Sequence, residues 1–176
     1  FAEIALKEMS CDTFKIVCFR YFNVAGAFPE VNLGENRNNE THLIPCAMSC
    51  GEIDEVLDVF GNDYNTNDGS GIRDYIHVRD LTSAHLLGIS DKIKNNFEIF
   101  NLGSGDGTSV FSIINEIKKI YPNFKFRISE RRIGDPAKLV ANCNKAKTYL
   151  GWEPKFSNIN NIIKDTHNFR AKAGVF

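Results

Sequence analysis

Arg73 is the residue of this sequence whose type and position most directly suggest chemistry. It follows a loop rich in Asn, Asp and Gly, and that loop follows the short apolar run 56–60. Such a run predicts a strand, and a loop of this composition predicts tight turns. A guanidinium held where a loop meets a strand suits bidentate binding of phosphate. The alternative is an arginine on a solvated turn, which is the commoner position for arginine.

Two further groups of residues have chemical potential. On spacing alone, Arg131, Arg132 and Asp135 predict no more than a surface ion pair. Tyr121 and Lys125 have the spacing of a catalytic Tyr-x-x-x-Lys pair, in which both side chains share one helical face and the lysine lowers the pKa of the tyrosine. Pro122 disfavours helical geometry at Tyr121, so we do not expect this pair to be catalytic.

The elements that position these residues alternate between strand and helix. Apolar runs predict strands at 14–19, 56–60, 97–102 and 124–128, the first being of the type buried on both faces. Helical periodicity predicts helices over 2–9, 81–93, 109–120, 145–150 and 159–170. A short helix should also end near Cys50 with Gly51 as its stop, and Asp80 should cap the helix that begins near Leu81.

The glycine-rich run 103–107 follows one of these strands and precedes a helix. It is not a dinucleotide fingerprint, because its third glycine comes too early and no acidic residue follows at the end of a next strand. We therefore predict a turn there, at a helix N-terminus that can still face an anion.

Three stretches resemble the signature of UDP-glucose 4-epimerases, which belong to the extended short-chain dehydrogenase/reductase superfamily. They are Phe60-Gly61-Asn62-Asp63-Tyr64, the pair Asp68-Gly69, and Arg73-Asp74-Tyr75-Ile76-His77-Val78. The match extends in order from Arg20 to Trp152, which makes it far more specific than a lone glycine pattern. The resemblance implies an α/β fold that combines the final strands of an NAD-binding Rossmann sheet with the smaller substrate-binding α/β domain.

The resemblance also implies residues that contact a UDP-hexose. Arg73 and Arg132 would contact the diphosphate, and Asp135 would accept from the ribose hydroxyls. The backbone at Asp58 and Val59 and the ring of Phe60 would receive uracil, and Val110 would lie near the uridine. A flat base needs an apolar wall and amide partners, which a strand end can provide.

Other implied contacts concern the sugar and the cofactor. Tyr21 and Phe22 would lie beside the nicotinamide of NAD, and Asn23 would contact the nucleotide sugar. The pair His42-Leu43 would lie close to the substrate, although His42 could simply start a helix. Leu139 would border the sugar ring and limit acceptance of N-acetylated hexosamines; the alternative is a core residue in a buried strand.

Composition narrows the class of protein. The 176 residues, 43% hydrophobic and 24% charged, are typical of one soluble globular domain. No apolar run approaches the ~20 residues of a membrane helix, and the net charge of −1 gives no reason to expect nucleic acid. The five cysteines show no paired spacing and are odd in number, which favours a reducing cytoplasm. His42, Cys46 and Cys50 repeat at i, i+4, i+8, but the first and last would be ~12 Å apart, so we expect no metal site.

The sequence begins without a methionine inside a helical pattern, and we expect a fragment of a longer protein. Residues 1–27 would be the end of the Rossmann domain and 28–176 the substrate-binding domain, with 97–107 returning to the Rossmann sheet. The implied function is interconversion of UDP-galactose and UDP-glucose by transient oxidation at C4 with bound NAD, in a homodimer whose catalytic Tyr/Lys pair lies upstream of Phe1. The alternatives are another UDP-sugar epimerase of the superfamily, or a non-catalytic domain that binds nucleotide sugar or a partner.

Overall fold

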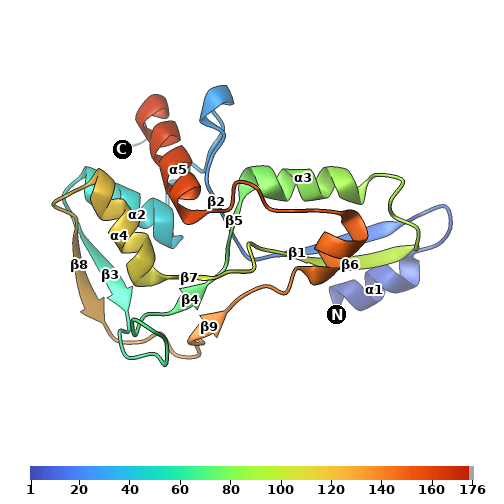
Figure 1. The fold of residues 1–176 in the computed structure, drawn as a ribbon, viewed down its shortest axis with the longest axis horizontal. Coiled ribbons are helices and arrows are strands. Elements are labelled where there is room, and N and C mark those ends of the chain that lie inside the picture. Colours follow the sequence, from blue (N-terminus) through green and yellow to red (C-terminus); the bar gives the residue numbers. More distant parts are fainter. Residues whose placement is uncertain (175–176) are drawn as a thin grey trace.

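The computed structural model describes residues 1–174 and shows an elongated α/β molecule with a packed group of elements at each end (Figure 1). The fold class is therefore as predicted. The strands form four small sheets, with the orders β1-β6, β2-β5, β3-β8 and β7-β4-β9. None of the helices among the described residues is long and apolar enough to span a membrane.

One end of the molecule is built on the parallel pair β1 (Ile16–Tyr21) and β6 (Phe97–Leu102), with Ile16 opposite Phe97. The helices α1 (Ala2–Met9) and α3 (Val78–Gly88) and the π-helix η2 (Ala146–Leu150) pack around this pair. Its core comprises buried residues from β5, α3, β6, η2 and the segments that follow. Phe100, Leu102 and Trp152 are among the largest of them.

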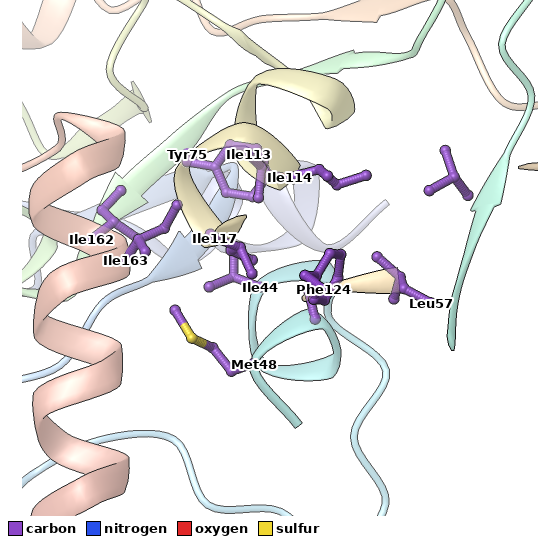
Figure 2. Packing of buried hydrophobic residues seen from close by; sticks show 12 residues of the cluster. Ile44, Met48, Leu57, Tyr75, Ile113, Ile114, Ile117, Phe124, Ile162 and Ile163 are labelled. Carbon is purple, nitrogen blue, oxygen red and sulfur yellow. The ribbon is translucent and has the colours of Figure 1, made fainter. Parts of the chain in front are cut away.

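The other end is built on the parallel pair β3 (Val56–Phe60) and β8 (Lys125–Ser129), covered by α2 (Leu43–Glu52) and α4 (Val110–Ile120), with α5 (Ile159–Ala173) packed against these two helices (Figure 1). Figure 2 shows its core, in which isoleucines of α4 and α5 meet Ile44 and Met48 of α2. The apolar residues of α4 recur at helical spacing, and burying this stripe against the sheet holds the layer together.

Short strands join the two ends. The strand β2 (Asn23–Ala25) pairs in parallel with β5 (Tyr75–His77), so that Asn23 lies opposite Tyr75. The strand β4 (Ile72–Arg73) lies between β7 (Thr108–Ser109) and β9 (Lys138–Leu139). A 3-10 helix, η1 (Pro29–Val31), follows β2 and contacts α5. This junction carries Asn23, Arg73 and Leu139, which are three of the residues predicted to bind substrate.

Several predicted helix boundaries are wrong. Gly51 does not stop α2, which continues to Glu52; a Cβ on Gly51 would lie 2.5 Å from the Tyr121 ring, so this glycine permits close packing inside the helix. The helix α3 starts at Val78 rather than near Leu81, because His77 is its N-cap and accepts a hydrogen bond from the backbone N–H of Arg79.

The side chain of Asp80 does not cap α3 as predicted but binds the segment 155–157. It accepts hydrogen bonds from the backbone N–H groups of Lys155 and Phe156, each at 2.8 Å, and from the hydroxyl of Ser157 at 2.6 Å. α3 also ends at Gly88, five residues before the expected Ile93. Finally, β1 is not buried on both faces, since its residues are half-buried or exposed in a sheet of only two strands.

Candidate functional site

A cavity of about 480 Å³ opens at the junction between the two ends of the molecule. Its walls come from β2, the start of α2, the end of β3, β4, β5 and the loop after β8. Ten of the eleven residues predicted to bind substrate line it, namely Asn23, His42, Leu43, Asp58, Val59, Phe60, Arg73, Val110, Arg132 and Asp135. Segments more than 100 residues apart in sequence therefore meet in a single concave site.

Arg73 provides one cation of this cavity. One amino group donates to the carbonyl of Ile72 at 2.8 Å, and the other lies 3.0 Å from Oδ1 of Asp135. The side chain is 18% exposed, and the absence of a side chain at Gly71 leaves room for the guanidinium. The ion pair fixes the planar fork, which still has donors available for an anionic ligand.

Arg132 provides the second cation. Its guanidinium lies 4.0 Å from the centre of the Phe60 ring, a cation–π arrangement at the end of β3. The neighbouring Arg131 instead lies over Tyr64, 4.2 Å from the ring centre, and its Nε is 2.5 Å from Asp63. The two adjacent arginines thus have separate roles. The surface ion pair that spacing suggested within this group is not formed, because Asp135 pairs with Arg73.

The end of β3 presents its backbone to the cavity. Leu57 and Val59 point into the core, while Asp58 points the other way, towards β8. The Asp58 carboxylate accepts from Nε of Arg127 at 2.6 Å and from Ser129 at 2.7 Å, and these bonds lower its pKa to about 2. Its charge is therefore already paired, which leaves the strand backbone and the Phe60 ring as the groups that can receive a flat base.

His42 and Asn23 lie where this cavity adjoins a second one of about 1060 Å³. His42 is the N-cap residue of α2, and its Nδ1 lies 3.0 Å from Glu35. The amide of Asn23 donates to the carbonyl of Asp74 at 2.8 Å. Tyr21 and Phe22, predicted to contact the cofactor, line the second cavity but not the first.

Leu139 is the predicted site residue that lines neither cavity. It lies in β9 opposite Arg73 and is 49% exposed, so it is not a core residue either. The structure therefore removes the buried-strand alternative for Leu139 without bringing it to the described walls.

Tyr75 is a cavity residue that sequence reasoning missed. It is 7% exposed, and burial raises its pKa to about 12, so its hydroxyl keeps its proton and can donate a hydrogen bond. The available signal was strand alternation, because residues i and i+2 point to the same face. Arg73 and Tyr75 have that spacing and line the same cavity.

The cysteines do not form the helical ligand set considered from the sequence. Cys46 lines the first cavity, and its thiol donates to the carbonyl of Glu40 at 3.6 Å. Glu35, Glu40 and His42 bring three possible ligand atoms within 4.8 Å of one another. However, Glu40 already accepts from the backbone N–H groups of Thr41 and His42, and Glu35 pairs with Arg37 at 2.8 Å. These contacts explain the cluster without a metal ion.

The glycine-rich loop 103–107 faces the chain's own Asp74 through its backbone, whereas the first N–H groups of α4 are bonded to Gly71, Ser70 and Ser109 and face no anion among the described residues. The Asp74 carboxylate accepts from the backbone N–H and hydroxyl of Ser104, at 2.7 and 2.6 Å, and from the N–H groups of Gly105 and Ala141, at 3.1 and 3.0 Å. Asp74 is fully buried. Because these donors are occupied, the loop holds β5 in place and is not a phosphate site.

Tyr121 and Lys125 are on separate elements. Tyr121 follows the last residue of α4, and its hydroxyl lies 3.2 Å from both Glu52 and His167, while Lys125 begins β8 and pairs with Asp54 at 2.6 Å. Burial and the nearby Glu52 carboxylate raise the pKa of Tyr121 to about 12. This is opposite to the depressed pKa that a tyrosine base requires.

The chain resembles known proteins in sequence. A family model described as "NAD dependent epimerase/dehydratase family" matches residues 1–103. A UDP-glucose 4-epimerase of Corynebacterium glutamicum is 42% identical over 158 residues, which are 88% of this chain and 47% of that protein.

Solved structures of UDP-glucose 4-epimerases also resemble this chain. A UDP-glucose 4-epimerase of Brucella ovis in complex with NAD is 38% identical, with a TM-score of 0.87 over 96% of this chain and 53% of that one. The enzyme of Bifidobacterium longum with NAD+ and UDP is 35% identical, with a TM-score of 0.82 over 91% and 48%. The chain thus spans about half the length of the relatives it matches.

Proposed function

The chain belongs to the NAD-dependent epimerase/dehydratase family, and from this membership we propose that it is the UDP-sugar-binding half of a UDP-glucose 4-epimerase. The observation that carries the proposal is the convergence of Arg73, Arg132 and Asp135 with the end of β3 in one cavity. Two guanidiniums, a carboxylate and an open strand backbone match the diphosphate, ribose and base of a nucleotide.

Each of these groups has one role in the proposal. Arg73 and Arg132 bind the diphosphate, and the protonated hydroxyl of Tyr75 is available to the same oxygens. Asp135 accepts hydrogen bonds from the ribose hydroxyls. The backbone at Asp58 and Val59 pairs with uracil, which rests on the Phe60 ring. Val110 borders the uridine.

The sugar then extends towards the second cavity. Asn23 and His42 line both cavities and lie between the nucleotide end and the Tyr21-Phe22 pair, with Leu43 beside them. Phe28, Leu33 and Phe156 give the second cavity apolar walls, which suit the flat nicotinamide ring of NAD. NAD would supply a reversible hydride acceptor for C4 of the sugar, and this chain's residues would hold the sugar against it.

We further propose that residues 1–27 complete a Rossmann domain with upstream sequence, that 28–176 form the substrate domain, and that 97–107 return to the Rossmann sheet. The parallel pairing of β1 with β6 supports this division, because each is an apolar strand with one neighbour in a sheet type that normally has several. The catalytic Tyr/Lys pair and the homodimer of the proposal belong to the full-length protein.

Two adjacent arginines test the binding role. We expect Arg132→Gln in the full-length protein to weaken UDP binding about tenfold or more in calorimetry, since a charge-assisted phosphate contact is lost. Arg131→Gln makes the same chemical change one residue away, at a side chain that does not line the cavity, and should change the affinity less than about threefold. Equal losses would contradict the proposed site.

Turnover tests the activity itself. The full-length protein should convert UDP-galactose to UDP-glucose, and a panel of UDP-pentoses and UDP-uronates should react more slowly. Preferred turnover of another UDP-sugar would favour the related epimerases, and UDP binding without any turnover would favour a non-catalytic binding domain.

A further inference from the structure

The ion pair between Arg73 and Asp135 lies inside the candidate nucleotide site, where both partners have proposed ligand contacts. We propose that Asp135 is a selectivity residue: by neutralising Arg73, it makes the cavity bind nucleoside diphosphates in preference to anions that carry phosphate alone. This inference rests on the proposed function and adds to it the reason why a phosphate site would contain a carboxylate.

The charges that line the cavity show why the carboxylate matters. Arg73 and Arg132 are the arginines among the lining residues, and Asp58 and Asp135 are the carboxylates. Asp58 is paired with Arg127 outside the cavity, so its charge is compensated there. The charge facing a ligand is therefore the two guanidiniums less the carboxylate of Asp135. Without that carboxylate, the cavity would attract small polyanions such as pyrophosphate more strongly.

A phosphate-only anion faces a disadvantage at this site. It must compete with Asp135 for the donors of Arg73, and once bound it remains beside a negatively charged carboxylate. Such a ligand keeps a net negative charge at neutral pH even where one of its oxygens is protonated, and it has no ribose hydroxyl to donate to Asp135. The repulsion therefore persists in the complex.

A nucleoside diphosphate brings its own donors. When Arg73 engages the diphosphate, the ribose hydroxyls can donate to Asp135, so the carboxylate exchanges one donor for another. There is room for a ribose beside this carboxylate, because the Asp135 side chain is 39% exposed and no atom lies within 4 Å of where a Cβ on the preceding Gly134 would be. The same carboxylate thus opposes pyrophosphate and favours the nucleotide.

The decisive measurement is the sign of the effect of Asp135→Asn on two ligands in calorimetry of the full-length protein. Inorganic pyrophosphate should bind about fivefold more tightly to the variant, the size expected for removing a partly exposed ion pair and a like charge. Uridine, which needs the ribose contact, should bind several-fold more weakly. Asp135→Ala should give the same two signs, which separates the loss of charge from any effect of the new amide.

Asp63→Asn is the matched control. It also removes one negative charge from a carboxylate paired with an arginine, but Asp63 is 71% exposed and neither it nor Arg131 lines the cavity. Its pyrophosphate affinity should change less than twofold. An equal gain in both variants, or pyrophosphate binding that is unchanged or weaker in Asp135→Asn, would overturn the inference.

The failure of the proposed function would have a different signature. In that case the wild-type protein would not bind UDP, whichever way the pyrophosphate affinity responds to Asp135→Asn. If UDP binds and only the pyrophosphate response is missing, the nucleotide site stands and the selectivity role of Asp135 is wrong.

Discussion

Asp74→Asn is the substitution that most sharply tests how the site is held in place. Asp74 lies between Arg73 and Tyr75, is fully buried, and points away from the cavity into the loop 103–107. Its Oδ1 accepts from the N–H and hydroxyl of Ser104, and its Oδ2 accepts from the N–H groups of Gly105 and Ala141. Asparagine has nearly the same shape but replaces one acceptor oxygen with a donor NH₂.

The expected cost follows from the two possible orientations of the amide. With the NH₂ at the Oδ1 position, the Ser104 hydroxyl can rotate to accept, but the N–H of Ser104 loses its partner. With the NH₂ at the Oδ2 position, the N–H groups of Gly105 and Ala141 both lose theirs. Each buried unpaired N–H costs about 1–3 kcal/mol, and the remaining bonds lose their charge assistance. The free energy of unfolding should therefore fall by about 2–5 kcal/mol.

The new amide has little room to reorient, because Asp74 is fully buried and packs so closely on Gly103 that a Cβ there would lie 2.4 Å from its Oδ2. We would measure urea unfolding of the full-length protein and, where it remains folded, the UDP affinity, which should fall because Arg73 and Tyr75 flank the substitution. Asp106→Asn is the control: it lies exposed in the same loop, and among the described residues its side chain makes no hydrogen bond. A change of less than about 0.5 kcal/mol for Asp74→Asn would refute the reasoning.

Three further predictions concern single side chains. Arg73→Lys should weaken UDP by about 1–3 kcal/mol and uridine much less, because lysine keeps the charge but loses the planar fork; equal losses in calorimetry would show that Arg73 does not bind phosphate. Burial lowers the pKa of His77 below its unfolded value although Asp165 lies 3.2 Å away. The stability that neutral His77 contributes is therefore fully present above its unfolded pKa of ~6.5 and is lost progressively as the pH falls below that value. His77→Asn, which keeps an N-cap acceptor, should flatten this pH dependence of urea unfolding. Leu139→Cys should raise kcat/KM selectively for UDP-N-acetylhexosamines, and Leu139→Tyr should abolish turnover of these substrates while sparing that of UDP-galactose. If each substitution changed kcat/KM for both substrate classes alike, Leu139 would not border the sugar.

The sequence predicts best those elements whose signals are local. The helix predicted over 109–120 is α4, because apolar residues at helical spacing coincide with a serine N-cap. The strand predicted at 56–60 is β3 with the same bounds, because a short apolar run ends there at a glycine. The turn at 103–107 was also predicted, but its anion was not identified, since the Asp74 carboxylate comes from some 30 residues away.

Long-range partners explain the errors. Asp80 is the capping residue by type, but Lys155, Phe156 and Ser157 occupy its carboxylate from more than 70 residues away, and His77 caps the helix instead. The pairing of Arg73 with Asp135 likewise crosses 62 positions, which spacing could not reveal. Resemblance supplied the site residues because it carries three-dimensional information that local periodicity lacks.

The two cavities differ in how completely this chain encloses them, and the difference has a mechanistic meaning. The nucleotide cavity has walls from the β3-β8 end of the molecule and from the junction strands, and its two guanidiniums are held by Asp135 and by the Phe60 ring. The second cavity is bordered by Tyr21, which is 52% exposed, and by a β1 strand with a single neighbour. In the proposed enzyme, binding energy would thus be concentrated on the part of the substrate that does not react, and the sugar would project beyond it. Binding energy placed at a distance can orient the reacting carbon without holding the sugar so tightly that its ring cannot present both faces.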